Sequence, residues 1–165
     1  MTSMIQHVLT IHFDEDALAR AFGTSPADAR AIMTDARTAT PIIQRRLAAD
    51  HEGWTLTQGP GGSDELRDPS GEQWRVKSIT EDTNFPPSKQ IGIGRRVDED
   101  EFVANWGGLA GYLLLDIQAF PDVTVYMVPI ANIQRWYEAG ELGKSAKAKR
   151  SKLMRRLLPD TKFAS

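Results

Sequence analysis

The chain has 165 residues, of which 41% are hydrophobic and 25% are charged, as expected for one folded domain. It has no cysteine, which excludes disulfides, thiolate catalysis and cysteine-based zinc sites. No apolar run approaches the roughly 18–20 residues that span a bilayer, and the N-terminus lacks the basic start of a signal peptide. We therefore expect a cytoplasmic protein that does not bind membranes.

The net charge of −2 conceals an uneven distribution along the chain. From Lys144 onward there are eight Lys or Arg and one Asp, whereas the first 143 residues have twelve basic and twenty-one acidic residues. A basic tail on an acidic body suits an arm that binds a polyanion. A solvated terminal helix explains the same charges equally well.

The first part of the chain, residues 1–52, is predicted to be mainly helical. Ser25–Pro26 and Thr40–Pro41 each place a good N-cap residue before a proline at the first helical position. Gly23 is expected to end the first helix, just before Ser25–Pro26. The expected elements are a strand and three helices, over Val8–Phe13, Asp14–Gly23, Pro26–Arg37 and Pro41–Glu52.

The remaining chain is predicted to form most of a sheet and then more helices. Asp68–Gly71 is a strong turn signal between two strands, and a tight turn is expected at Pro121–Asp122. Strands are expected over residues 53–58, 64–67, 72–79, 111–120 and 122–130, a loop over 85–96, and helices over 97–108, 131–142 and 146–158. This order predicts one domain over residues 1–165, of the α/β or α+β class, with a central mixed sheet flanked by helices.

The segment from Gly61 to Ser78, GGSDELRDPSGEQWRVKS, combines a turn, a hairpin and charged side chains. Because alternate residues of a strand share a face, Arg75 and Lys77 are expected to point the same way. The hairpin should bring Asp64 back beside them. An acid and a lysine in this arrangement suit phosphodiester hydrolysis, in which the acid holds a divalent cation and the lysine orients water and stabilises developing charge.

These residues resemble the PD-(D/E)xK nuclease core of type II restriction endonucleases, particularly the compact PvuII-like kind. The matched segments are Gly62–Asp64, Asp68–Gly71 and Trp74–Ile79, within a core that covers residues 53–138. The resemblance implies a restriction-endonuclease-like core and a sequence-specific, Mg²⁺-dependent endonuclease that cuts double-stranded DNA as a homodimer. It also implies that Asp64 is the metal-binding acid and Lys77 the catalytic lysine.

Arg75 departs from this motif, because an acid is expected two residues before Lys77. An arginine cannot ligate a metal, and its positive charge opposes the arrival of a cation. A second metal-ligating carboxylate can come from Glu65, Asp50 or Glu52. Alternatively, the site has lost catalysis and keeps DNA binding through Arg75 and Lys77, or Arg75 is an introduced change that disables an enzyme. A coincidental match is the remaining alternative.

The loop after the lysine has side chains suited to reading DNA. Amides can pair with adenine, and lysine or arginine can contact guanine or phosphate. An ordinary polar loop is the simpler interpretation. The candidate DNA-binding residues are Asn84, Lys89, Gln90, Arg95 and Arg96.

Leu18–Met33 also fits a helix-turn-helix, which would make the protein a DNA-binding regulator without hydrolytic activity. Acidic residues outnumber arginines by five to three between Asp14 and Arg37, whereas a recognition helix is expected to be basic. Dimerisation through residues 1–52, or simple packing on the sheet, are the other roles for these helices. The basic segment over residues 144–165 is expected to form a C-terminal helix.

Asp116 is a charged residue in an otherwise apolar strand, YLLLDIQ. Burying a carboxylate costs free energy unless it is paired. A salt bridge or a place on an edge strand is therefore the expected role of Asp116, and a functional site is the alternative.

Overall fold

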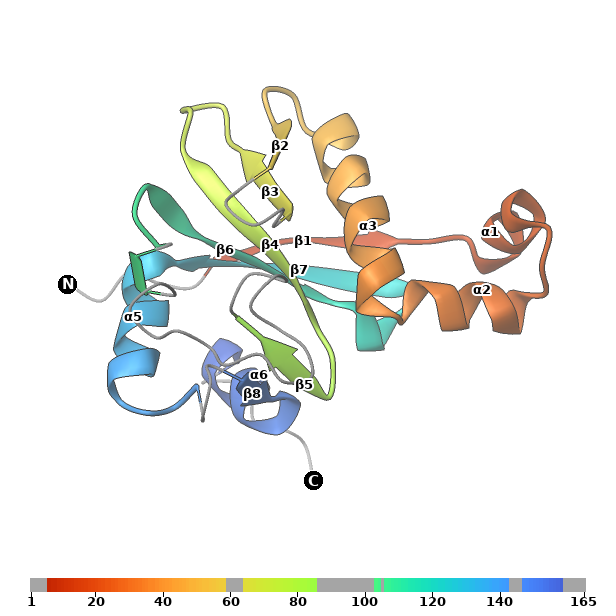
Figure 1. The fold of residues 1–165 in the computed structure, drawn as a ribbon. Helices are drawn as coiled ribbons and strands as arrows, with labels where there is room; N and C mark the ends of the chain where they lie inside the picture. Colours follow the sequence, from red (N-terminus) through yellow and green to blue (C-terminus); the bar gives the residue numbers. More distant parts are fainter. Residues whose placement is uncertain (1–5, 59–63, 86–102, 105, 143–146, 159–165) are drawn as a thin grey trace.

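The computed structural model describes residues 6–58, 64–85, 103–104, 106–142 and 147–158. These residues form a mixed α+β structure with a twisted six-stranded sheet, five α-helices and a separate two-stranded sheet (Figure 1). The predicted class and the central mixed sheet flanked by helices are confirmed. None of the helices in this part of the chain is long and apolar enough to cross a membrane.

The large sheet has the strand order β1-β7-β6-β4-β3-β2. Strands β4 and β6 are parallel, and every other neighbouring pair is antiparallel. This order places β4, which carries Arg75 and Lys77, in the interior of the sheet. The strands are β1 (Gln6–His12), β2 (Thr55–Gln58), β3 (Asp64–Arg67), β4 (Gln73–Ile79), β6 (Leu109–Asp116) and β7 (Asp122–Pro129).

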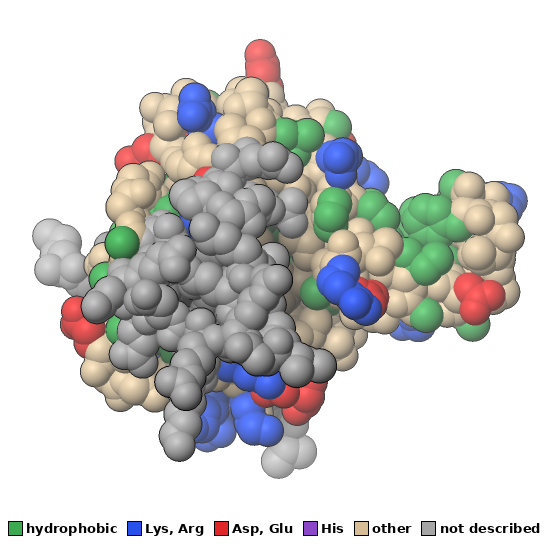
Figure 2. Space-filling view, in the orientation of Figure 1, with side chains coloured by type: hydrophobic (Ala, Val, Ile, Leu, Met, Phe, Trp, Pro, Cys, Tyr) green, Lys and Arg blue, Asp and Glu red, His purple; other side chains and the backbone are tan. Residues whose placement is uncertain are grey.

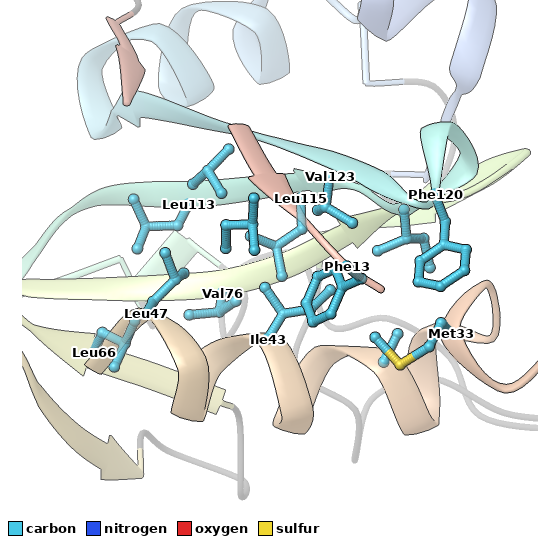
Figure 3. Close-up of a cluster of buried hydrophobic side chains, with 14 of the residues drawn as sticks. Phe13, Met33, Ile43, Leu47, Leu66, Val76, Leu113, Leu115, Phe120 and Val123 are labelled. Carbon is cyan, nitrogen blue, oxygen red and sulfur yellow. The ribbon is translucent and has the colours of Figure 1, made fainter. Parts of the chain in front are cut away.

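Helices cover both faces of the sheet. On one face, α2 (Pro26–Met33) and α3 (Ala36–Asp50) pack against apolar side chains of the strands, as Figure 3 shows for Ile43, Val76 and Leu113. The other face is covered by α5 (Ile130–Glu138), α6 (Arg150–Leu157) and the two-stranded sheet of β5 (Asp82–Asn84) and β8 (Lys147–Lys149). The alternation of β4 therefore directs Val76 toward α3 and Arg75 toward the opposite face.

The boundary between the second and third helices differs from the prediction. Helix α2 ends four residues before the predicted end, and α3 begins at Ala36 rather than at Pro41. Asp35 is the true N-cap, because its carboxylate accepts a hydrogen bond of 2.9 Å from the Arg37 backbone N–H. Thr40 lies inside the helix, where its hydroxyl donates to the Ala36 carbonyl at 2.6 Å. The prediction of Thr40 as the N-cap is therefore wrong, and the helix begins five residues before Pro41.

Three later segments also differ. The strand predicted to reach residue 120 ends at Asp116, and Ile117–Ala119 form a 3-10 helix, η3, before the cis Phe120–Pro121 peptide. Residues 82–84, expected to belong to the loop after Lys77, form β5. The first residues of the predicted basic helix form β8, the strand that pairs with β5. Of the helix predicted over 97–108, most residues lie outside the described part of the chain, although 103–104 are helical.

The helix predicted over Asp14–Gly23 is confirmed as α1 (Glu15–Phe22). Gly23 ends it in the left-handed conformation at φ 67°, which glycine adopts without strain. Helix α1 and the start of α2 extend beyond the edge of the sheet (Figure 1), whereas Met33 at the end of α2 packs in the apolar cluster.

The predicted β3–β4 hairpin is confirmed, and Asp68 organises its turn. One oxygen of Asp68 accepts from the backbone N–H groups of Ser70 and Glu72, both at 2.9 Å. The other accepts from the Trp74 indole at 3.0 Å. Partial burial opposes ionisation of Asp68, but the hydrogen bonds from Ser70, Trp74 and Glu72 outweigh it and lower the pKa of the carboxyl below its ordinary value of 3.8.

We expect the Asp68→Asn variant to lose less stability than the wild type when the pH is lowered from about pH 5 to about pH 3. The folded pKa of Asp68 lies below its unfolded value, so its stabilising contribution exists above the unfolded pKa and disappears as the pH falls through the folded pKa. Asparagine retains an oxygen acceptor for the turn but does not titrate. Urea denaturation at each pH measures the effect, and parallel losses in both proteins would contradict it.

Candidate functional site

The register of the β3–β4 hairpin decides which acid lies beside Arg75. Glu65 is directly opposite Arg75, and Leu66 is opposite Trp74. The backbone of Asp64 pairs with Gln58 on the other side of β3, and the Asp64 side chain lies outside what the structure describes. Glu65 is therefore the acid that the hairpin brings to Arg75.

Glu65 and Arg75 form a buried ion pair. The Arg75 Nη2 and Nε atoms donate to Glu65 Oε1 at 3.1 and 3.3 Å. The exposed fraction of the side chain is 0% for Arg75 and 2% for Glu65. Gln73 donates from Nε2 to Glu65 Oε2 at 2.6 Å and also to the Thr57 hydroxyl. Both carboxylate oxygens of Glu65 thus accept hydrogen bonds from β4.

Tyr112 of β6 encloses the same ion pair. It is opposite Arg75 in the parallel register, and its hydroxyl is 3.4 Å from Arg75 Nη1. The Arg75 guanidinium carbon is 5.8 Å from the centre of the Tyr112 ring, and the Tyr112 hydroxyl donates to the Phe85 carbonyl at 3.4 Å. Burial raises the pKa of the Tyr112 phenol, which therefore keeps its proton and remains a donor.

This arrangement does not fit the Mg²⁺ site that the resemblance implies. The cation of Arg75 occupies the place beside Glu65, and Arg75 itself has no surface with which to contact phosphate. Of the other proposed acids, Asp50 bonds to Arg46 at 2.5 Å and Glu52 is exposed beyond the end of α3. Among the described residues no three His, Asp or Glu side chains cluster closely enough to hold a metal ion.

Lys77 and Asn84 lie on the Arg75 side of the sheet. Lys77 is half-buried on β4 and opposite Leu114 of β6. Asn84 is half-buried in β5, where it pairs with Lys147 of β8. The other four candidate DNA-binding residues lie outside the described part of the chain; they are Lys89, Gln90, Arg95 and Arg96.

Asp116 forms the expected salt bridge. Both of its carboxylate oxygens accept hydrogen bonds from Arg150, at 2.7 and 2.9 Å. The hydrogen bond to Asp116 raises the pKa of the Arg150 guanidinium. This bidentate pair attaches the start of α6 to the end of β6. Sequence reasoning found Asp116 but missed Arg150, because no local pattern reports a contact across thirty-four positions.

The helices of the predicted helix-turn-helix make contacts within the protein. The second helix of this motif, α2, has two charged residues, Asp28 and Arg30. Arg30 bonds to Glu15 of α1 and donates to the Phe120 carbonyl at 2.9 Å. The other, Asp28, accepts a hydrogen bond of 2.9 Å from the Ser25 hydroxyl. Both side chains thus have partners within the protein.

The C-terminal segment carries an exposed basic surface. In Figure 2, Lys and Arg side chains gather at the lower edge of the molecule, where Figure 1 places α6 and β8. Arg156 of the same helix is bonded to Glu141. We refer to the exposed Lys147, Lys149, Lys152 and Arg155 as the basic surface. Of these, Lys147 forms an ion pair of 3.7 Å with Asp82.

Comparisons with known proteins return no relative. No protein-family model matches the sequence, and neither curated proteins nor solved structures give a significant match.

Proposed function

We propose that this protein binds double-stranded DNA without cutting it, through a nuclease-like core whose metal site is replaced by an internal ion pair. The observation that carries the proposal is the complete burial of Arg75 against Glu65. A cation at this position holds the acid that would otherwise be available to a metal. Hydrolysis that depends on a divalent ion is therefore disfavoured in this arrangement.

The basic surface supplies the attraction to DNA. Lys149, Lys152 and Arg155 project from one short strand and the helix that follows it. Lysine and arginine near the phosphate backbone release condensed counterions, which makes affinity strongly dependent on salt. The Asp116–Arg150 bridge supports this role, because it holds α6 against the sheet.

We expect the affinity for a labelled DNA duplex, measured by fluorescence anisotropy, to fall steeply between about 50 and about 200 mM salt. Chelator should not change it. Lys149→Ala should weaken binding and reduce the slope of log affinity against log salt by about one. Arg37→Ala, which removes an exposed cation at the start of α3, should leave the slope unchanged. Absence of binding at low salt would refute the proposal.

A metal-dependent endonuclease is the second candidate. It is favoured by the β3–β4 hairpin, because Asp64 and Lys77 belong to neighbouring strands. These strands are part of a mixed sheet flanked by helices. Such an enzyme needs a carboxylate that is free to bind metal. The Arg75→Glu variant tests whether restoring one is sufficient.

A further inference from the structure

A recess of about 460 Å³ lies where the end of α5 and the turn after it meet β8 and α6. Its apolar floor belongs to the packed core, because Trp136, Leu142 and Leu153 are only 4%, 2% and 2% exposed. The side chains of its lining that reach solvent are all charged. The recess therefore offers charge rather than apolar surface to a ligand. These charged side chains are Glu141, Lys152, Arg155 and Arg156.

Three of these side chains are cations from one helix, and only one of the three is bonded to the acid. Lys152 lies three positions before Arg155 and four before Arg156, so it is a neighbour of both on the surface of α6. Arg156 is bonded to Glu141. In the described part of the chain, no ion pair joins Lys152 or Arg155 to an acid. Arg155 donates from Nε to the Ser151 carbonyl at 3.2 Å, which orients its guanidinium and leaves the two terminal nitrogens as donors.

We infer that this recess binds the terminal phosphate of a DNA strand, an assignment that rests on the proposed DNA binding and adds to it a preference for phosphorylated ends. A terminal phosphate monoester carries a charge of about −1.5 to −2 at pH 7, which exceeds the single charge of a phosphodiester within the strand. Lys152 and Arg155 match this charge, because a lysine ammonium and an arginine fork both suit phosphate oxygens. A terminal phosphate also projects from the end of the strand and can enter a recess, whereas phosphates along the duplex need only an exposed cation such as Lys149.

Fluorescence anisotropy with three forms of one internally labelled duplex tests this assignment. The forms carry a 5′-phosphate, a 3′-phosphate or hydroxyl groups only at their ends. At constant salt, at least one phosphorylated form should bind about tenfold or more tightly than the hydroxyl form, because charge-assisted hydrogen bonds to the phosphate are added. The form that binds more tightly identifies which end enters the recess.

Two variants separate the recess from general electrostatics. Arg155→Ala should reduce the preference for the phosphorylated duplex to less than about threefold, because the arginine fork is lost. Lys149→Ala is the matched control, since it removes an exposed cation of the same surface that does not line the recess. It should weaken binding of all three duplexes alike and retain the preference.

The outcomes distinguish failure of this assignment from failure of the proposed function. Equal affinity for the phosphorylated and hydroxyl forms would overturn the terminal-phosphate site and leave DNA binding intact. The assignment also fails if Arg155→Ala and Lys149→Ala lose the preference to the same degree. If no form of the duplex is bound at low salt, the terminal-phosphate site and the proposed function both fail.

Discussion

Arg75→Ala will lower the free energy of unfolding by about 3–5 kcal/mol. The substitution leaves the Glu65 carboxylate, whose side chain is 2% exposed, without its cation in the interior of the sheet. It also removes a hydrogen-bonding partner of Tyr112. Urea denaturation followed by circular dichroism measures the loss, and an unchanged slope with denaturant would show that the native fold is retained.

Two controls separate the buried charge from the loss of packing. The double variant Glu65→Leu with Arg75→Met replaces both ions by apolar side chains of similar length, and should recover most of the loss. Arg37→Ala breaks an ion pair whose arginine side chain is 91% exposed, and should have little measurable effect. If Arg75→Ala were no more destabilising than Arg37→Ala, the Glu65–Arg75 pair would not be a buried charge pair in solution.

The hairpin that carries the candidate site could be predicted because its signals are local. Asp68, Ser70 and Gly71 lie within four positions and together specify the turn. The alternation of β4 then assigns Arg75 and Val76 to opposite faces. The same local logic located the Gly23 end of α1 and the Ser25 cap of α2, but failed at α3, whose cap is Asp35 rather than the predicted Thr40.

The partners of the charged residues could not be predicted, because they depend on pairings between distant segments. Glu65 rather than Asp64 meets Arg75 because the turn fixes the antiparallel register, and a shift of one residue exchanges the two acids. Tyr112 meets Arg75 only through the parallel register of β4 and β6. A parallel register leaves no pattern in either strand alone. The sequence therefore could not predict that Tyr112 covers the Glu65–Arg75 pair.

The proposed function implies that Arg75 takes the place of a metal ion beside Glu65. A cross-strand arginine satisfies the charge of Glu65 without an ion, so the sheet remains stable when no metal is bound. The reverse change should then make stability depend on metal. Glutamate at position 75 would face Glu65 directly, and two like charges opposite each other on adjacent strands repel.

Arg75→Glu should therefore be destabilised in chelator and regain stability when Mg²⁺ or Mn²⁺ is added. A metal present at 100 times its dissociation constant would contribute about 2.7 kcal/mol, which a thermal melt detects readily. The wild type should show no such response, because Arg75 already neutralises Glu65. If the core is that of a nuclease lacking one ligand, the same variant should also nick plasmid DNA in the presence of metal.

Arg75→Gln is the matched control for this experiment. It removes the guanidinium without supplying a ligand, so it should be destabilised to a similar degree but should not respond to metal. Nicking by Arg75→Glu should disappear when Asp64→Ala or Lys77→Ala is added, because a contaminating nuclease would survive these changes. An equal response of the glutamate and glutamine variants to metal would show that position 75 is structural only. In that case the resemblance to a nuclease would have to rest on the hairpin alone.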